Sequence, residues 1–182
     1  MIQINETKFK DVYKIEPKYF EDARGWFTDT WSVRDYRNKG INYNFVQDSK
    51  SFSEKKYTLR GLHFQLEPME QAKLITCVKG AIRDAIVDLR EDSPTYLQWM
   101  MLEITEESRI QLLIPRGFAH GFLTLEDKTE VHYKLDNEYA PQQQRTLLWK
   151  DTDVGIDWKI EEKKIILSEK DRNGLTIKEL FR

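Results

Sequence analysis

The chain has 182 residues, of which 40% are hydrophobic and 33% charged, a composition typical of a globular protein and not of a disordered one. The formal net charge of −2 does not favour a polyanionic partner such as DNA or an acidic membrane. Its one cysteine, Cys77, excludes an internal disulfide and a four-cysteine zinc site. No apolar run reaches the ~18 residues that span a bilayer, and the N-terminus lacks the pattern of a signal peptide. We therefore expect a single domain over residues 1–182, located in the cytoplasm, with no nucleic-acid or membrane partner.

Short apolar stretches separated by turn residues dominate the chain from residue 73 onward. The predicted strands are 73–79, 81–89, 98–105, 110–114, 120–125 and 129–135. Helical patterning is weak and is confined to 33–39 and a short piece near the C-terminus. Strands this closely spaced leave no room for crossover helices. The pattern predicts an all-β fold, an antiparallel jelly roll or small barrel with a few short helices, whose interior can hold a ligand.

The two-residue period of a strand sorts the candidate side chains by face. In the stretch 129–135, Tyr133 shares a face with apolar residues and is predicted to point inward, whereas His132 points outward. Lys73 and Asp84 fall on the apolar faces of consecutive strands. Because an isolated charge is costly in an apolar interior, we predict a buried Lys73–Asp84 pair, which could serve a binding site or only the core.

Two histidines stand in apolar strand patterns, each after a glycine turn: His63 and His120. The spacing P-x-G-x-x-H that ends at His120 resembles the second motif of the cupin superfamily. In the first motif, Gln65 stands where cupins that bind a metal carry a second histidine, and Lys73 occupies the stretch where they carry a glutamate. A cation beside the pocket opposes a divalent metal. We therefore predict a cupin pocket without a metal ion.

Nine blocks, in order along the chain, resemble the dTDP-4-dehydrorhamnose 3,5-epimerase family. They are DARGWF (22–27), FVQD (45–48), LRGLHFQ (59–65), KL (73–74), VDLR with SPT (87–90 and 93–95), IPRGFAHGF (114–122), YK (133–134), LW with an aspartate (148–151) and SEKD (168–171). The resemblance covers nearly the whole chain. It implies a cupin-type antiparallel jelly roll and an epimerase that needs no cofactor.

The substrate implied by the resemblance is a dTDP-linked 4-keto-6-deoxy sugar. Protons on the carbons beside the ketone are acidic because the resulting anion delocalises as an enolate, so a base, an acid on the opposite face and a cation near the ketone oxygen are needed. The resemblance assigns His63 as the base, oriented by Asp171, and Tyr133 as the acid. Lys73 matches the family's pocket lysine and would stabilise the enolate oxygen, with Asp84 orienting it.

Further residues match family positions that contact the substrate. Arg24, Arg60 and Lys170 would bind the pyrophosphate, and Tyr139 would stack on the base. The other positions at or beside family substrate contacts are Asp29, Gln47, Asp48, Ser49, His120 and Gln144, and Asp84 is added to the predicted binding residues by its strand parity. Three of them depart from the family pattern: Ser49 replaces asparagine, and Asp29 and Gln144 replace glutamate. Thr146 and Lys150 also differ from the family's glycine and asparagine.

Arg60 and His63 have opposite parity on a regular strand, so we predict a bulge at Gly61 that turns both toward the pocket. The family resemblance further implies a homodimer in which residues 24–27 complete the neighbour's site, and a role in supplying L-rhamnose-type sugar to a cell-surface polysaccharide.

Other functions remain open at this level. They are an epimerase of one carbon, a 3,4-ketoisomerase of nucleotide sugars, a non-catalytic sugar-nucleotide-binding cupin and a metal-dependent cupin oxygenase.

Overall fold

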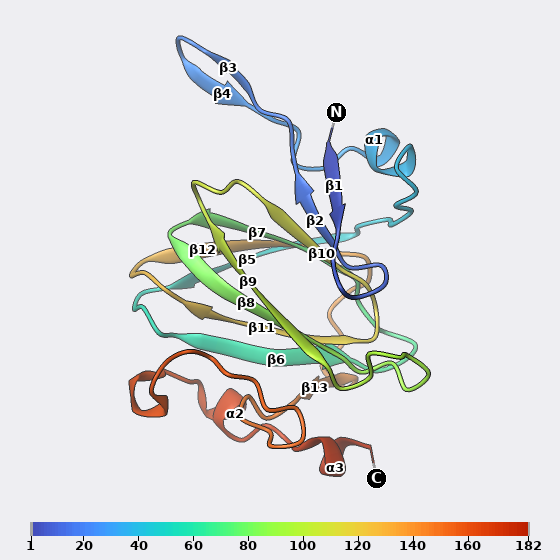
Figure 1. The fold of residues 1–182 in the computed structure, drawn as a ribbon, viewed down its shortest axis with the longest axis vertical. Coiled ribbons are helices and arrows are strands. Elements are labelled where there is room, and N and C mark those ends of the chain that lie inside the picture. Colours follow the sequence, from blue (N-terminus) through green and yellow to red (C-terminus); the bar gives the residue numbers. More distant parts are fainter. Residues whose placement is uncertain (1, 182) are drawn as a thin grey trace.

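The computed structural model describes residues 2–181, which form two antiparallel sheets that face each other (Figure 1). The larger sheet has the order β1-β2-β10-β7-β12-β5, and the smaller has the order β13-β6-β11-β8-β9. The strands are β1 Gln3–Glu6, β2 Tyr13–Glu16, β3 Phe20–Asp22, β4 Gly25–Phe27, β5 Gln47–Ser53, β6 Leu59–Gln65, β7 Lys73–Lys79, β8 Ala81–Asp88, β9 Trp99–Thr105, β10 Gln111–Ile114, β11 Phe118–Thr124, β12 Thr129–Leu135 and β13 Gln144–Thr146. The helical turns are short: α1 Val33–Arg37, a 3₁₀ turn at Glu162–Lys164, α2 Glu169–Arg172 and α3 Ile177–Leu180.

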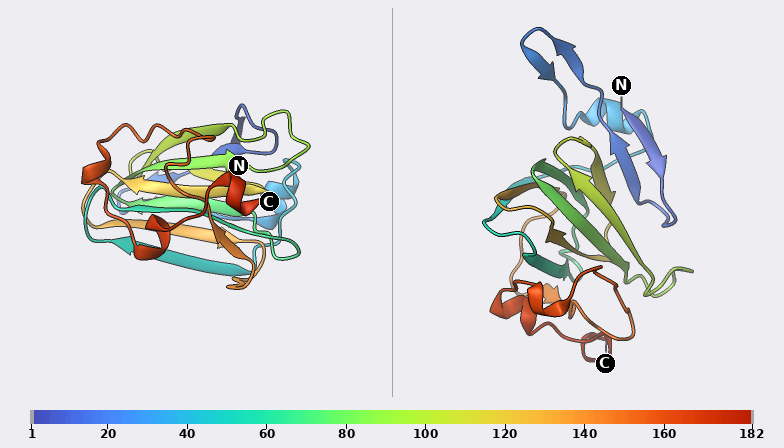
Figure 2. Two further views of the ribbon diagram at one scale, coloured as in Figure 1. Left: turned by 90° about the horizontal axis from the view of Figure 1, so that it is seen from below. Right: turned by 60° about the vertical axis from the view of Figure 1, so that its left-hand side comes forward.

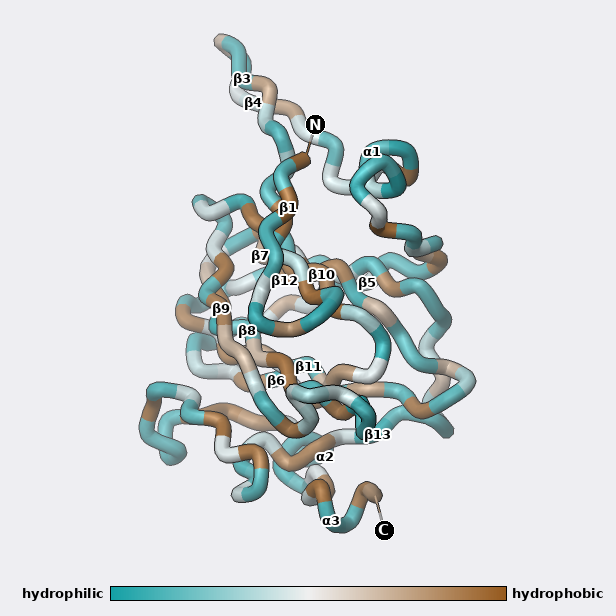
Figure 3. Tube along the Cα trace, turned by 45° about the vertical axis from the view of Figure 1, so that its right-hand side comes forward, coloured by the Kyte–Doolittle hydropathy of each residue, from teal (hydrophilic) through white to brown (hydrophobic). Residues whose placement is uncertain are grey.

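Three apolar clusters occupy three layers. The central one fills the space between the sheets, with Ile75 and Val131 of the larger sheet meeting Ile86 and Phe122 of the smaller. A second cluster lies between the outer face of the smaller sheet and the C-terminal segment, which runs beneath β6 in Figures 1 and 2. The third packs α1 against the other face of the larger sheet. Figure 3 shows apolar residues on the strands of the two sheets and also along the C-terminal segment around α2 and α3.

Most predicted elements are confirmed. The stretches 73–79 and 129–135 coincide with β7 and β12, and 81–89, 98–105 and 110–114 match β8, β9 and β10 to within one residue at one end. The stretch 120–125 corresponds to β11, which begins earlier, directly after the turn at Gly117. Helix 33–39 ends two residues early, because the chain turns at Gly40, whose φ is +83°. The strands β1, β2, β3 and β5 carry too many charged and polar residues to stand out by hydrophobicity, and β4, Gly-Trp-Phe, is too short.

The predicted side-chain parity is also confirmed. Tyr133 joins the cluster between the sheets, and Lys73 and Asp84, only 8% and 1% exposed, lie on the inner faces of β7 and β8. His132 lies on the opposite face of β12 from Tyr133, as its parity predicts.

A hairpin of β3 and β4, here called the arm, extends away from the two sheets (Figures 1 and 2). Its strands pair only with each other, and all six of their residues are exposed. The exposed residues include Phe20, Trp26 and Phe27, which are 51%, 55% and 64% exposed. Large exposed aromatic side chains that lie close together are typical of interaction surfaces.

Within residues 2–181 no helix has both the length and the apolar character needed to cross a membrane.

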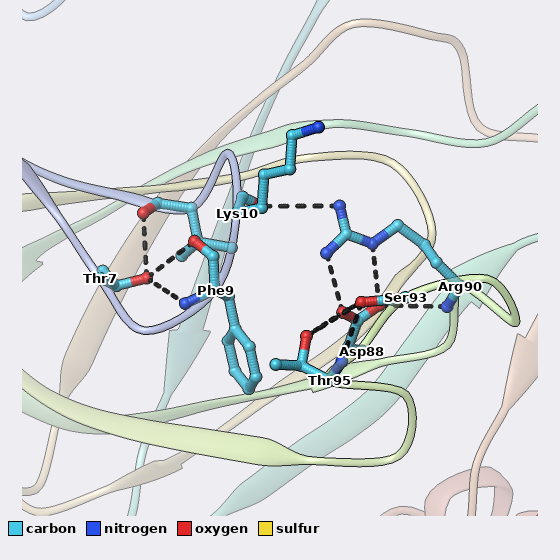
Figure 4. A network of polar contacts seen from close by, with 8 residues as sticks. Thr7, Phe9, Lys10, Asp88, Arg90, Ser93 and Thr95 are labelled. Carbon is cyan, nitrogen blue, oxygen red and sulfur yellow. Dashed lines mark hydrogen bonds and ion pairs between the residues drawn. The ribbon is translucent and has the colours of Figure 1, made fainter.

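A buried carboxylate holds the loop between β8 and β9 (Figure 4). Asp88 is 0% exposed and accepts two hydrogen bonds from the Arg90 guanidinium at 2.8 Å, one from the Ser93 hydroxyl at 2.6 Å and one from the Thr95 hydroxyl at 2.7 Å. Arg90 also donates to the carbonyl of Lys10 at 3.5 Å and covers the ring of Phe118. The block VDLR…SPT therefore joins the N-terminal turn to this loop, which is a structural task.

We predict that Asp88→Asn destabilises the fold by roughly 2–3 kcal/mol at pH 7. Burial alone would raise the pKa of the Asp88 carboxyl, but hydrogen bonds from Arg90, Ser93 and Thr95 lower it to about 2. The unfolded chain therefore binds a proton between about pH 2 and the ordinary value of 3.8 that the folded chain does not bind. This contribution to stability is complete above that window and is lost as the pH falls through it.

Urea unfolding of wild type and Asp88→Asn at pH 7 and pH 2.5 measures the effect. The difference in unfolding free energy is expected to shrink at the lower pH. Asp92→Asn, at an exposed position in the same loop, is the control and is expected to change little. Equal stability of Asp88→Asn and wild type at pH 7 would contradict the prediction.

Candidate functional site

A cavity of about 490 Å³ opens between the two sheets and is bordered by the C-terminal segment. Strands β5, β7 and β12 of the larger sheet and β6 and β11 of the smaller contribute polar side chains to it. The lining consists of Ser51, Thr58, Leu59, Arg60, His63, Lys73, His120, Phe122, Tyr133, Ile166, Leu167, Ser168, Lys170 and Asp171. All four residues predicted to be catalytic, His63, Lys73, Tyr133 and Asp171, are among them.

His63 and Asp171 form a hydrogen-bonded pair across the gap between β6 and the C-terminal segment. The distance from His63 Nε2 to Asp171 Oδ1 is 2.5 Å, and the Asp171 side chain is 6% exposed. The Ser168 hydroxyl accepts from the Asp171 amide and so begins the short helix α2 that presents this carboxylate. Burial alone would raise the pKa of Asp171, but the hydrogen bond and charge of His63 hold it below its ordinary value. Since a carboxylate only accepts hydrogen bonds, Nε2 carries the proton and Nδ1 is the ring nitrogen able to act as a base.

A bulge at Gly61 turns both Arg60 and His63 toward the cavity, as predicted. His63 pairs with His120 of β11 and Arg60 with Phe122, so two residues of β6 oppose one residue of β11. Gly61 has a φ of +127°, and a Cβ there would lie 2.5 Å from the Cα of Gly121. Only glycine fits this approach of two backbones.

Tyr133 reaches the cavity from β12 of the opposite sheet. Its hydroxyl lies 2.8 Å from the Ser51 hydroxyl of β5. Burial raises the pKa of the Tyr133 phenol, an effect that the Ser51 hydrogen bond and the charge of Arg60 partly offset. The phenol therefore holds its proton at neutral pH and is available as an acid.

Lys73 is the buried cation of the cavity. Its ammonium donates a hydrogen bond of 3.0 Å to the carbonyl of His63. Burial lowers the pKa of Lys73 to about 8, and the negative charge of Asp84 opposes this shift.

The prediction of a direct Lys73–Asp84 ion pair is wrong, although both side chains are buried as predicted. Asp84 Oδ2 accepts a hydrogen bond of 2.8 Å from Nε2 of His120, and Lys73 bonds to the His63 carbonyl instead. His120 lies on β11, the strand that pairs with β8, and its imidazole bonds to the Asp84 carboxylate. Lys73 interacts with that carboxylate only through its charge, without a direct contact. The other oxygen, Oδ1, is buried with no hydrogen-bond partner among residues 2–181. Burial lowers the pKa of the His120 imidazole, so this ring is neutral at pH 7.

Five of the residues predicted to bind substrate join into one polar network beside the cavity. The Gln144 side-chain oxygen accepts from the Tyr139 hydroxyl at 2.6 Å and from the Lys170 ammonium at 2.7 Å. The Gln47 side chain accepts from the Tyr139 amide at 2.9 Å and donates to the Ser49 hydroxyl at 3.0 Å. Tyr139 is 52% exposed, so its ring is accessible for stacking.

Of the predicted binding residues, Arg60, Lys73, His120 and Lys170 line the cavity, whereas Arg24, Asp29 and Asp48 neither line it nor bond to a lining residue among residues 2–181. Arg24 lies on the arm, where it pairs with Asp22 at 2.5 Å and is 89% exposed, and Asp29 follows the arm at an exposed position. Asp48 alternates with the inward residues of β5 and forms an ion pair with Lys134 on the outer face, at 3.0 Å. The position of Arg24 agrees with the expectation that residues 24–27 serve a neighbouring subunit, whereas the outward face of Asp48 could not be inferred from the family match.

Gln65 is fully engaged with backbone groups. Its amide donates to the carbonyls of Met69 and Glu138, and its oxygen accepts from the Ala140 amide. Where metal-binding cupins have a second histidine, this chain thus uses an amide to hold two loops. Within residues 2–181 no cluster of three or more His, Cys, Asp or Glu side chains is arranged to hold a metal ion.

Sequence reasoning missed several lining residues, among them Ser51, Phe122 and Ser168. Ser51 could have been found, because residues 47, 49, 51 and 53 alternate with more exposed positions along β5 and share the inward face. The contribution of Ile166 and Leu167 depends on the path of the C-terminal segment, which carries no periodic signal.

Comparison with known proteins gives a consistent result. The sequence model of the dTDP-4-dehydrorhamnose 3,5-epimerase family matches residues 6–179. The dTDP-4-dehydrorhamnose 3,5-epimerase of Shigella flexneri is 42% identical over 174 residues, which cover 95% of this chain and 94% of the relative. The crystal structure of the Bacillus anthracis enzyme with TDP and PPi bound has a TM-score of 0.93 at 42% identity, covering 97% of this chain and 100% of that one. The dTDP-6-deoxy-D-glucose-3,5-epimerase of Legionella pneumophila, in complex with dTDP-4-keto-L-rhamnose, has a TM-score of 0.92 at 35% identity, covering 98% and 94%.

The fold and the cavity define a cupin-type jelly-roll enzyme with groups for acid–base chemistry. The chain belongs to the dTDP-4-dehydrorhamnose 3,5-epimerase family and is an isomerase of the nucleotide-sugar pathway to dTDP-L-rhamnose.

Proposed function

We propose that this chain converts dTDP-4-dehydro-6-deoxy-D-glucose to dTDP-4-dehydro-L-rhamnose, with His63 as the base and Tyr133 as the acid. The observation that carries the proposal is that the two side chains reach one cavity from opposite sheets. A sugar ring bound between them would present one face to an imidazole and the other to a phenol. That is the arrangement needed to remove a proton on one side and return it on the other.

The base is prepared by its partner. Asp171 holds His63 in the tautomer with Nε2 protonated and stabilises the imidazolium that forms when Nδ1 takes the proton. The same pair acts twice, once at each carbon beside the ketone. Epimerisation leaves the oxidation state of the sugar unchanged, so a base, an acid and a cation at the ketone oxygen are sufficient, and we propose that no cofactor takes part.

Lys73 provides the positive charge for the developing enolate. Its ammonium lies in a buried site, where a charge acts more strongly than it would in water. His120, kept neutral and held by Asp84, lines the cavity beside it and can donate or accept a hydrogen bond at the sugar. Asp84 thus orients His120 by contact and influences Lys73 by charge.

The nucleotide binds at the mouth of the cavity. Arg60 and Lys170 line the cavity and would neutralise the pyrophosphate, and the exposed Tyr139 ring would stack on the thymine. Gln144 holds the side chains of Tyr139 and Lys170, and Gln47, bonded to Ser49, holds the backbone of Tyr139. Arg60 is held separately, by the Ser53 hydroxyl and the Phe52 carbonyl.

The arm of a second copy of the chain completes the site. Arg24 and Asp29 have no access to the cavity of their own chain, and the arm carries exposed aromatic side chains suited to an interface. We therefore propose a homodimer in which each arm supplies Arg24 to the partner's cavity. We also propose that residues 1–182 form one domain that acts in the cytoplasm and supplies L-rhamnose for a cell-surface polysaccharide, with no nucleic-acid or membrane partner.

We predict deuterium incorporation at both carbons beside the ketone when the wild type acts on the keto sugar in D₂O. His63→Asn is expected to lose turnover by about 10²–10⁴-fold, because no base remains. Tyr133→Phe is expected to keep exchange at the face served by His63 but to invert the carbons slowly, since no acid serves the other face. NMR of the sugar nucleotide measures both exchange and inversion.

His132→Asn and Tyr96→Phe, which change a histidine on the outer face of β12 and a tyrosine of the β8–β9 loop, serve as matched controls. Exchange at one carbon would show an epimerase of a single centre. A shift of the ketone itself would show a ketoisomerase. If the wild type shows no activity, the chain would be a non-catalytic protein that binds sugar nucleotides.

We predict that kcat falls as the pH rises through about 8. Lys73 is charged below its pKa of about 8 and neutral above it, so stabilisation of the enolate is lost on the alkaline side. Asp84→Asn removes the negative charge that supports the ammonium, so the alkaline limb of the profile is expected to move to lower pH. Lys73→Met is expected to lower kcat by about 10²-fold or more and to abolish this limb. An unchanged alkaline limb of the kcat–pH profile in Lys73→Met would contradict the assignment of this limb to Lys73.

We predict that His63→Asn and Arg24→Gln complement each other in mixed dimers. The cavity of the Arg24→Gln chain retains His63 and receives an intact arm from the His63→Asn chain, so one of two sites works. Dimers purified through two different tags are expected to show about half the wild-type activity, while each variant alone is nearly inactive. Activity equal to the mean of the two parents would exclude a shared site.

A further inference from the structure

The position of the arm is set by very few contacts with the rest of the chain. A two-stranded hairpin is at best marginally stable alone, and this one pairs with no other strand. At its base, the Gln111 side chain donates to the carbonyl of Thr30 at 3.0 Å. This contact ties the end of the arm to β10 but leaves the direction of the hairpin open.

Arg109, in the turn between β9 and β10, contacts side chains from both halves of the hairpin. Its guanidinium lies 4.7 Å from the ring centre of Tyr19 and 5.1 Å from that of Trp26. It also forms an ion pair of 3.1 Å with Glu21. The two rings meet edge to face at 4.9 Å, so the residue before β3 and the middle of β4 converge on one cation.

We infer that Arg109 is a positioning residue for the reaction: it fixes the angle of the arm and thereby the place at which Arg24 reaches the partner's cavity. The inference rests on the shared site proposed above and adds a residue that matches none of the family blocks in the sequence. Arg109 itself touches no substrate, since it acts on the arm of its own chain.

The physical reason lies in the planar guanidinium. It can stack on aromatic faces and bond to a carboxylate at the same time, which the compact ammonium of lysine does less well. Without it, the hairpin would sample several directions, and only a fraction would present Arg24 correctly. The apparent affinity for substrate falls in proportion to that fraction, whereas the chemistry of a correctly bound substrate is unchanged.

Arg109→Gln is therefore expected to raise KM by about tenfold, the combined effect of cation–π contacts and an exposed ion pair, with little change in kcat. The KM of Arg109→Lys is expected to lie between that of Arg109→Gln and that of the wild type. Arg34→Gln is the matched control, because Arg34 is an exposed arginine whose ion pair is with its own neighbour Asp35. An unchanged KM in Arg109→Gln would overturn the inference.

Mixed dimers decide whether the defect acts through the arm. In the first, one chain carries His63→Asn with Arg109→Gln and the other is wild type, so the only working cavity receives the altered arm. In the second, one chain carries His63→Asn and the other Arg109→Gln, so the working cavity belongs to the Arg109→Gln chain and receives a normal arm. We expect the raised KM in the first and the wild-type KM in the second. The reverse result, or equal values, would overturn the inference.

A second variant approaches the same contact from the arm. Tyr19→Leu removes one ring, and the double variant with Arg109→Gln is expected to raise KM by less than the product of the two single effects. Fully multiplicative effects would show that the two residues act separately and would overturn the inference.

If His63→Asn and Arg24→Gln fail to complement, the shared site itself falls. If they do complement while the Arg109→Gln defect stays with the cavity, only the role of Arg109 falls.

Discussion

The hydrogen bond between His63 and Asp171 joins the C-terminal segment to the smaller sheet, and the site depends on it. Residues 166–168, 170 and 171 form one border of the cavity, so the contact that orients His63, the proposed base, also helps to shape the space proposed for the sugar. Asp171 is brought there by a helix of only four residues, begun by the hydroxyl of Ser168. In the proposed mechanism, the orientation of the base and the formation of this border therefore depend on the same contact.

The interior of the sandwich contains charges that an apolar core would exclude. Each is balanced by a specific neighbour: Asp171 by His63, Asp84 by His120, and Lys73 by a carbonyl of β6. Charges buried in this way are costly and are typical of functional sites, in keeping with the roles proposed for these residues. Asp88, which is equally buried, has its four side-chain donors within its own loop and serves stability alone.

In the proposed homodimer, the arm would bring substrate-binding residues of one subunit to the cavity of the other. A side chain that binds substrate can lie far from the cavity of its own chain when symmetry supplies the second copy. Each chain must then fix the orientation of its own arm, because a hairpin without further strand partners is easily displaced. In this proposal Arg109 fixes that orientation, because its guanidinium lies against two rings and a carboxylate of the arm.

The sequence by itself determined the all-β class, most strands from residue 73 onward and the inward faces of Lys73, Asp84 and Tyr133, because alternation along a strand is a local property. It also determined the bulge at Gly61, since only an extra residue reconciles the parity of Arg60 with that of His63. The tertiary structure alone decided that Asp84 bonds to His120 and not to Lys73, that Asp48 faces outward, and that Ser51 supports Tyr133. These outcomes depend on which strands become neighbours and on the competition among buried groups for one partner, and neither is encoded within a short stretch of chain.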